Sequence, residues 1–262
     1  MATSPHQHSV IFGLNRASND SVDRRELKVL SMDDWRPVGR YCGDGIADAQ
    51  GRAAPMASDS GRFQHPCFAR CYQRISRVVD RNGGAQDRVR LLAGLTGRVV
   101  EIGAGNGLNF PHYPTGVQEV IAVEPEDHLR ALAERAAAAA PVPIRVVAGH
   151  AEALPVEDGS TDAAVFSLVL CSVSDPVAAL AEAHRVLHPG GSLRFFEHVR
   201  SPHRLVGTVQ DLLAPMTTAL LGGCRFNRDT GATIRDSDFV VDDLVTLHLG
   251  GVSHILGQAH HA

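Results

Sequence analysis

The most constraining feature of this 262-residue sequence is a short apolar run that contains one acid and leads into three alternating glycines. The run Val99-Val100-Glu101-Ile102 is followed at once by Gly103-Ala104-Gly105-Asn106-Gly107. Apolar β-branched residues predict a buried strand, and glycines let the backbone turn tightly and approach a flat ligand because they carry no Cβ. The feature therefore predicts an open α/β sheet with a ligand crevice at the carboxyl end of this strand.

Strand and helix patterns alternate on both sides of this run. Helical spacing of apolar residues predicts one helix from about residue 68 to 79 and a second that ends at Leu91-Leu92. Further helices are predicted at 127–139, after the N-cap Asp175, at 205–221 with a kink or break at Pro215, and after Asp229. Strands are predicted at 98–102, 117–123, 144–147, 162–170 and 192–198, and a terminal hairpin at 239–249 and 252–258.

This order predicts an α/β fold with a doubly wound, Rossmann-like, seven-stranded sheet. The sheet should be mostly parallel, with an antiparallel hairpin at its C-terminal edge. The turn His188-Pro189-Gly190-Gly191 should end the helix that precedes the strand at 192–198. The apolar face of that helix is expected to include Val177, Leu180 and His184, with His184 in a packing role.

A second acid ends the next predicted strand, in Val120-Ile121-Ala122-Val123-Glu124-Pro125. A carboxylate at this position can accept both hydrogen bonds of a ribose diol, and its spacing from the glycines fits either NAD or S-adenosylmethionine (SAM). The dinucleotide pattern Gly-x-Gly-x-x-Gly requires glycine at position 108, where this chain has Leu108. The acid at 101 also suits a cationic sulfonium and ammonium better than a pyrophosphate. SAM is therefore favoured, and an NAD-dependent oxidoreductase is a distant alternative.

Four segments in this order resemble the class I SAM-dependent methyltransferases. The segments are the glycine turn, the strand ending at Glu124, the stretch Gly149 to Pro155, and the helix end at residues 186–191. Residues 98–197 resemble the methyltransferase-11 type, which includes quinone-biosynthesis C-methyltransferases. A longer resemblance, over about 68–258, is to the methyltransferase-like family that contains alkyl-thiol methyltransferases. It is carried by four further stretches: residues 109–114, 167–173, 196–199 and 223–230.

The resemblance implies SAM as cofactor and assigns roles by motif. The methionine end of SAM is expected at Glu101, Gly103, Gly105 and Gly107, with Ala104 in the same turn, and the ribose at Glu124 beside Pro125. Leu168 is expected near the sulfonium. The adenine is expected between His150, Ala151 and Glu152, and many relatives in the wider class carry Asp where this chain has His150.

The acceptor is expected to be a small molecule, with a thiol preferred. C- or O-methylation of a quinone-like or other apolar molecule, and SAM binding without catalysis, remain alternatives. His198 is the first candidate for a base or an acceptor-positioning group, because imidazole titrates near neutral pH; the alternative is a histidine hydrogen-bonded at a strand end. Glu197 and Cys171 lie in the same region, and Cys171 is interpreted as a small buried hydrophobe rather than a nucleophile. Residues 212–221 should either cover the acceptor pocket or pack in the core.

The composition excludes several other classes. A formal net charge of −4 without a basic stripe argues against nucleic-acid binding, and no uncharged apolar run reaches the roughly 18 residues of a membrane span. Five scattered cysteines without a CxxC pair predict neither a disulfide framework nor a metal site, and indicate a reducing, cytoplasmic location. Residues 1–60 are polar and aperiodic and are predicted to be a weakly ordered tail before a catalytic domain at 61–262. The oligomeric state is left open.

Overall fold

The computed structural model describes residues 64, 66–249 and 252–261. The predicted tail at 1–60 and the Gly250-Gly251 turn of the hairpin lie outside these residues, so both stay predictions. In the part of the chain that is described, no helix has the length and apolarity to cross a membrane.

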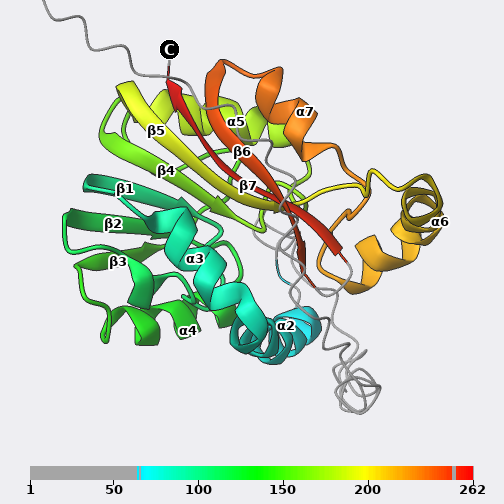
Figure 1. Ribbon diagram of the computed structural model, residues 1–262. Helices are drawn as coiled ribbons and strands as arrows, with labels where there is room; N and C mark the ends of the chain where they lie inside the picture. Colours follow the sequence, from blue (N-terminus) through cyan, green and yellow to red (C-terminus); the bar gives the residue numbers. More distant parts are fainter. Residues whose placement is uncertain (1–63, 65, 250–251, 262) are drawn as a thin grey trace, which may run out of the picture.

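Seven strands form one sheet in the order β3-β2-β1-β4-β5-β7-β6 (Figure 1). The first five strands run parallel to one another, and β7 pairs antiparallel with both β5 and β6. The predicted mixed sheet with an antiparallel C-terminal edge is confirmed. The strands are β1 (Gly97–Ile102), β2 (Val117–Val123), β3 (Ile144–Val147), β4 (Thr161–Ser167), β5 (Leu187–His198), β6 (Phe239–Leu249) and β7 (Val252–His261).

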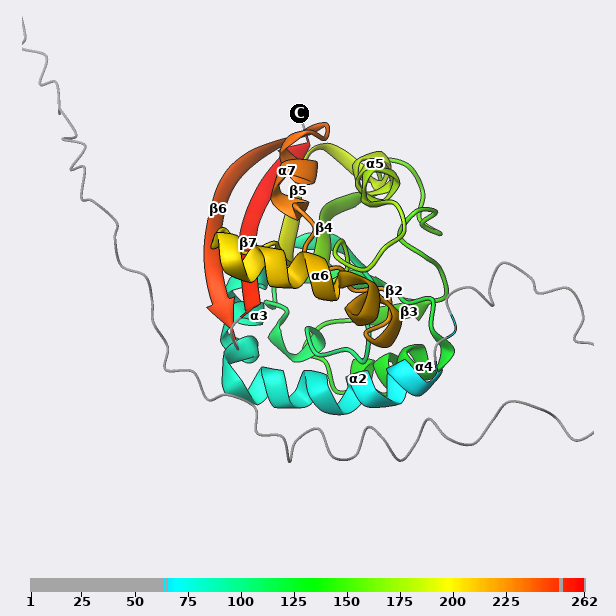
Figure 2. The same ribbon diagram turned by 90° about the vertical axis from the view of Figure 1, so that its right-hand side faces the viewer.

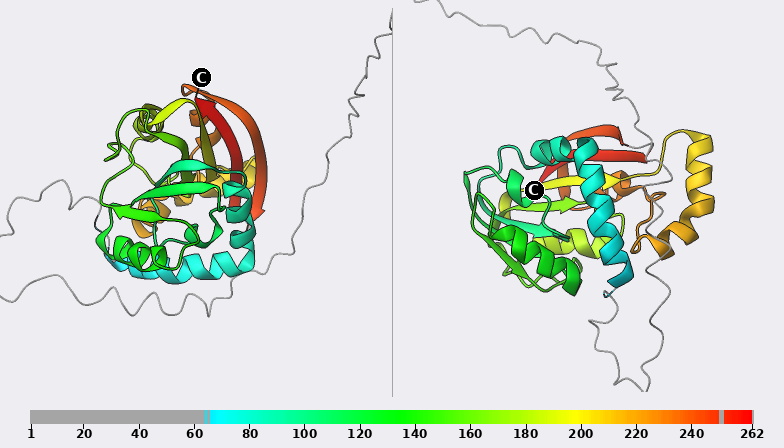
Figure 3. Two further views of the ribbon diagram at one scale, coloured as in Figure 1. Left: turned by 90° about the vertical axis from the view of Figure 1, so that its left-hand side faces the viewer. Right: turned by 90° about the horizontal axis from the view of Figure 1, so that it is seen from below.

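Helices cover both faces of the sheet. Figure 3 shows helices on the two sides of the sheet. On one face, Leu91 and Leu92 of α3 and Ala133 of α4 pack in one core cluster with β1 and β2, and on the other face α5 and α7 pack in a second cluster. The buried side chains alternate between these clusters along each strand, as a doubly wound sheet requires. The helical elements are α2 (Pro66–Val79), η3 (Asp80–Gly84), α3 (Ala85–Leu92), η4 (Phe110–His112), α4 (Asp127–Ala137), α5 (Pro176–Val186), α6 (Arg204–Leu220) and α7 (Thr230–Arg235).

Three predicted strand limits are wrong, and one of them is the end of β7, which continues to His261 rather than stopping at residue 258. β4 ends at Ser167 rather than at residue 170, because Leu168 adopts a left-handed backbone conformation with φ of 63° and turns the chain out of the sheet. β5 begins at Leu187 rather than at 192: Leu187 pairs with Thr161, and the pairing then jumps to Ser192. Residues 188–191 therefore bulge out of the strand instead of preceding it.

The helix ends follow the predicted capping. Asp175 accepts hydrogen bonds from the backbone N–H groups of Val177 and Ala178, and Asp229 accepts one from Ala232, so both begin their helices as expected. The prediction that Val177 belongs to the buried face of α5 is wrong, because this side chain is 64% exposed while Leu180 is buried.

Helix α6 stands apart from the sheet (Figures 1 and 3) and continues through Pro215 without a break. Leu212 is 78% exposed and Met216 is 54% exposed. The prediction that this segment covers a pocket or packs in the core is therefore wrong for these two side chains.

Candidate functional site

The candidate site lies where the strand order reverses. The sheet proceeds from β1 to β2 and β3 in one direction and from β4 to β5 in the other, so the carboxyl ends of β1 and β4 diverge above a crevice. Figure 2 looks toward this end of the sheet, with α6 in front of it. A cavity of about 290 Å³ opens there, lined by Phe68, Tyr72, Gly103, Gly105, Glu124, Pro125, Glu126, Leu129, Gly149, His150, Ala151, Glu152, Ser167, Leu168, Val169, Ser172, Val173, Ser174, Gly222 and Gly223.

The glycine turn is held against the neighbouring strand. The N–H groups of Gly103 and Ala104 both donate to the carbonyl oxygen of Val123, at 2.8 and 3.0 Å. Gly103 and Gly105 have φ of 70° and 57°, which L side chains rarely adopt. A Cβ at Gly103 would lie 2.6 Å from Cγ2 of Val169, so the glycine is also required for space.

Glu124 stands at the edge of this turn and is only 5% exposed. Its Oε2 accepts a hydrogen bond from the N–H of Gly105 at 2.7 Å, and its Oε1 accepts one from the N–H of Glu126 at 3.0 Å. Burial raises the pKa of Glu124 to about 7, against the lowering effect of these two hydrogen bonds. Each carboxylate oxygen keeps a second lone pair, so the group can still accept two hydrogen bonds from a diol.

Glu101 lies beneath the turn rather than on the cavity surface. It is 2% exposed and accepts hydrogen bonds from Nδ2 of Asn109 at 2.9 Å and from the hydroxyl of Tyr113 at 2.7 Å. Burial raises the pKa of Glu101 to about 7, while the two hydrogen bonds and the charge of Arg88 lower it. A cation bound near Glu101 would therefore stabilise the ionised form of this buried carboxyl group.

Arg88 is a site component that the sequence analysis did not identify. Its side chain is buried and donates from Nη1 to Asn109 at 2.7 Å and to the hydroxyl of Ser167 at 3.2 Å, and from Nε to Asp80 at 3.0 Å. It therefore links α3 to the ends of the strands below the cavity. A sequence signal existed: Arg88 precedes Leu91 and Leu92 by three and four positions and so shares their buried helix face.

The stretch after β3 supplies the predicted adenine neighbours. His150, Ala151 and Glu152 all line the cavity, and Nδ1 of His150 lies 3.4 Å from Oε2 of Glu152. Oε1 of Glu152 accepts hydrogen bonds from the backbone N–H groups of Ser174 and Asp175, which fixes this carboxylate beside the start of α5. A polar rim of this kind can address the edge of a heterocycle.

A segment of six residues, 168–173, follows β4 and is called the wall loop here. It begins with the left-handed Leu168, whose N–H donates to the carbonyl of Phe196 at 2.7 Å. Leu168, Val169, Ser172 and Val173 of the loop line the cavity. A non-glycine residue with positive φ costs free energy, so surrounding contacts must hold this turn in place.

The buried Glu197 and the half-buried Arg228 hold the wall loop. The carboxylate of Glu197 accepts hydrogen bonds from three successive backbone N–H groups, those of residues 169–171, at 2.8 to 3.2 Å. The guanidinium of Arg228 donates to the carbonyl oxygens of Leu170 and Val173. Glu197, which the sequence placed among possible catalytic groups, is thus engaged in supporting the loop.

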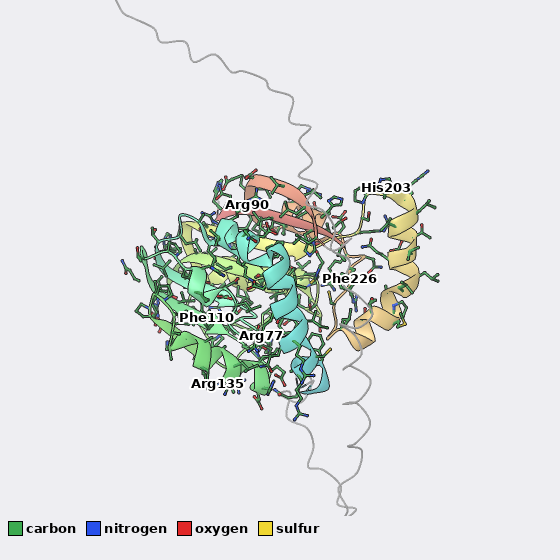
Figure 4. All side chains as sticks on the ribbon, turned by 60° about the horizontal axis from the view of Figure 1, so that its bottom comes forward. Arg77, Arg90, Phe110, Arg135, His203 and Phe226 are labelled. Atoms are coloured by element: carbon green, nitrogen blue, oxygen red, sulfur yellow. The ribbon has the colours of Figure 1, made fainter. Side chains whose placement is uncertain are left out.

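His198 does not line the cavity. Its Nδ1 lies 3.3 Å from Sγ of Cys171 and 3.5 Å from Sγ of Cys224, and the ring of Phe226 packs edge-on against it at 4.6 Å. Figure 4 labels Phe226 in the segment between α6 and the sheet. Burial lowers the pKa of His198 well below its ordinary value, with a smaller contribution from His254. Its catalytic role stays a prediction.

The predicted cofactor residues divide into two groups. Those that line the cavity are Gly103, Gly105, Glu124, Pro125, His150, Ala151, Glu152 and Leu168. Glu101, Ala104 and Gly107 support the turn from behind: Ala104 is 7% exposed, and a Cβ on Gly107 would lie 2.8 Å from the ring of Phe110.

The chain is similar to known methyltransferases in sequence. A family model described as a methyltransferase domain matches residues 100–195. Thiol S-methyltransferase TMT1B of Homo sapiens is 34% identical over 158 residues, which cover 58% of this chain and 64% of the human protein. The same-named protein of Rattus norvegicus is 33% identical over 188 residues, or 70% of this chain and 73% of the rat protein. The aligned part therefore spans a little under two thirds of the human relative.

A solved structure shares the fold. The crystal structure of a SAM-dependent methyltransferase from Thermotoga maritima superposes with a TM-score of 0.55 at 23% identity, over 74% of this chain and 98% of that protein. At this level of identity the match shows the fold alone.

Proposed function

Because the chain belongs to the class I SAM-dependent methyltransferases, in the family that includes the thiol S-methyltransferases, we propose that it transfers a methyl group from SAM to the sulfur of a small thiol. One observation of the structure carries the proposal. A single cavity at the switch point joins the glycine turn and the carboxylate of Glu124 to an apolar wall.

The residues around the cavity fit SAM. The positive φ of Gly103 and Gly105 favours glycine, and the missing Cβ leaves space above the turn, where the methionine part would lie over the buried carboxylate of Glu101. Glu124 would accept from the ribose diol, and residues 150–152 would flank the adenine. When bound, SAM supplies an electrophilic methyl group on a cationic sulfur.

The acceptor part of the proposal rests on the apolar lining and on the named relatives. Phe68, Leu168, Val169 and Val173 give one part of the cavity an apolar lining. A thiol with a pKa of about 8.5 already carries some thiolate near neutral pH and needs little general-base help. The contribution expected of the protein is to align the sulfur with the methyl group and to exclude water, which can supply roughly 7–11 kcal/mol.

The test is a methyl-transfer assay with matched acceptors. The full chain is incubated with SAM and a series of small alkyl thiols, the corresponding alcohols, and a quinol, and the S-adenosylhomocysteine and methylated products are measured by mass spectrometry. Methyl thioethers without methyl ethers support the proposal. Turnover on the quinol alone favours the quinone-like alternative.

A calorimetric SAM titration accompanies the assay. SAM binding without turnover on any acceptor indicates the non-catalytic alternative. Absence of SAM binding overturns the cofactor assignment itself.

A further inference from the structure

Three side chains with metal-binding atoms meet beside the cavity. Cys171 lies in the wall loop, His198 ends β5, and Cys224 follows Gly223 after α6. Cys171 lies 27 positions before His198, and Cys224 lies 26 positions after it, which is why no short motif marks them. The scattered cysteines predict no metal site, but the fold brings two of them together beside a histidine.

The three atoms form a triangle with nearly equal sides. Nδ1 of His198 is 3.3 Å from Sγ of Cys171 and 3.5 Å from Sγ of Cys224, and the two sulfurs are 3.6 Å apart. A tetrahedral zinc ion with Zn–S near 2.3 Å and Zn–N near 2.0–2.1 Å requires edges of about 3.8 Å between sulfurs and about 3.5 Å between sulfur and nitrogen. The observed triangle matches one face of that tetrahedron to within a few tenths of an ångström.

From this geometry we propose that Cys171, Cys224 and His198 bind a zinc ion through Sγ, Sγ and Nδ1. Thiolate and imidazole ligands select Zn²⁺ over Mg²⁺ or Ca²⁺, which prefer oxygen. Two thiolates, a neutral imidazole and Zn²⁺ sum to zero charge, which suits a place where both cysteines are buried. Three protein ligands leave the fourth position to water or to a small exogenous ligand, as in open zinc sites.

The surroundings orient the ligands. The backbone N–H of Cys171 donates to Glu197, and the ring of His198 contacts the rings of Phe226 and His254, with ring centroids 4.6 Å away in each case. These contacts fix the backbone of Cys171 and the ring plane of His198. The ion would connect the wall loop to the segment after α6, because Cys171 belongs to the first and Cys224 to the second. The chain neighbours of the two cysteines, Ser172 and Gly223, both line the cavity.

The competing interpretation is a redox pair. The two sulfurs at 3.6 Å are well beyond the S–S bond length of about 2.05 Å, but a small movement would join them. A disulfide and a metal site predict different compositions of the purified protein, so one experiment separates them.

The experiment measures metal content in the untagged full-length chain, purified under reducing conditions without chelator. Elemental analysis should give about one zinc per chain. Replacement by Co²⁺ should give the visible bands of tetrahedral cobalt with thiolate ligands. The variants Cys171→Ser, Cys224→Ser and His198→Ala should each lower the metal content at least tenfold, whereas Cys71→Ser, which changes a cysteine of α2 outside the cluster, should leave it unchanged.

Three results would overturn the proposal. They are an unsubstituted chain that contains no zinc and gives no cobalt bands, a metal content that survives all three variants, and a Cys171–Cys224 disulfide found by peptide mass spectrometry of a second sample prepared without reductant. The cobalt spectrum of the unsubstituted chain keeps the test valid if a variant fails to fold. None of these measurements uses an acceptor or turnover, so their outcome is independent of the proposed thiol methylation.

Discussion

Replacing Glu124 by alanine tests the cofactor site most directly. The carboxylate is 5% exposed, and each oxygen already accepts one backbone N–H and retains one lone pair toward the cavity. Two hydrogen bonds from the ribose to a charged acceptor, at about 1.5 kcal/mol each, sum to about 3 kcal/mol. Glu124→Ala should therefore weaken SAM binding by about a hundredfold, measured by calorimetry at constant pH.

The same substitution also frees the N–H of Gly105, so the diol contact must be separated from damage to the turn. A thermodynamic cycle does this by comparing SAM with its 2′-deoxy analogue on both proteins. The unsubstituted chain should bind the 2′-deoxy analogue more weakly than SAM, whereas the variant should bind the two ligands with nearly equal affinity.

Glu119→Ala is the matched control. Glu119 lies on the same strand, β2, is about one-third exposed, and pairs with Arg98 and Arg145 away from the cavity, so its removal should leave SAM affinity unchanged. Equal SAM affinity in Glu124→Ala and the unsubstituted chain, or strictly additive losses in the cycle, would remove Glu124 from the ribose site.

Three further outcomes are expected. Because burial raises the pKa of Glu101 and Glu124 from 4.5 to about 7, each contributes stability below pH 4.5 that is lost as pH rises through 7. Without SAM, the protein should therefore melt at a lower temperature at pH 8 than at pH 5.5, and a higher melting temperature at pH 8 would contradict the raised pKa values. Asp175→Ala removes the N-cap of α5 and should lower the free energy of unfolding by about 1 kcal/mol in urea titrations, with no change in SAM affinity. Gly103→Ala should weaken both SAM binding and stability, because backbone strain at positive φ adds to a 2.6 Å contact between the new Cβ and Val169. Gly159→Ala has a similar φ but open space around the new Cβ, so it should lower only the free energy of unfolding, by about 1–2 kcal/mol; equal effects of the two substitutions on SAM binding would refute the steric argument.

The sequence predicted the sheet and most of the cofactor side of the site. Local patterns explain this success: apolar runs mark the strands, the glycines mark the turn, and Asp175 and Asp229 mark helix starts. Each of these signals is contained in a few neighbouring residues.

The acceptor side depends on contacts between distant segments and was predicted less well. The left-handed Leu168, the hydrogen bonds of Arg88 to Asn109 and Ser167, and the meeting of Cys171 with Cys224 arise only when several elements pack together. The exposed apolar side chains of α6 were misjudged for a similar reason, since an apolar segment in sequence does not say which neighbour, if any, covers it.

The support of the wall loop affects the thermodynamics of ligand recognition. Glu197 and Arg228 satisfy the amides of residues 169–171 and the carbonyls of Leu170 and Val173, so the loop is held in one conformation by groups that a ligand does not need to supply. Binding then loses little conformational entropy, and affinity depends on how well the ligand's shape matches a fixed contour. Affinity for different acceptors should accordingly depend on the size and branching of their hydrocarbon portion. It should fall steeply for acceptors that fit only if the wall loop moves.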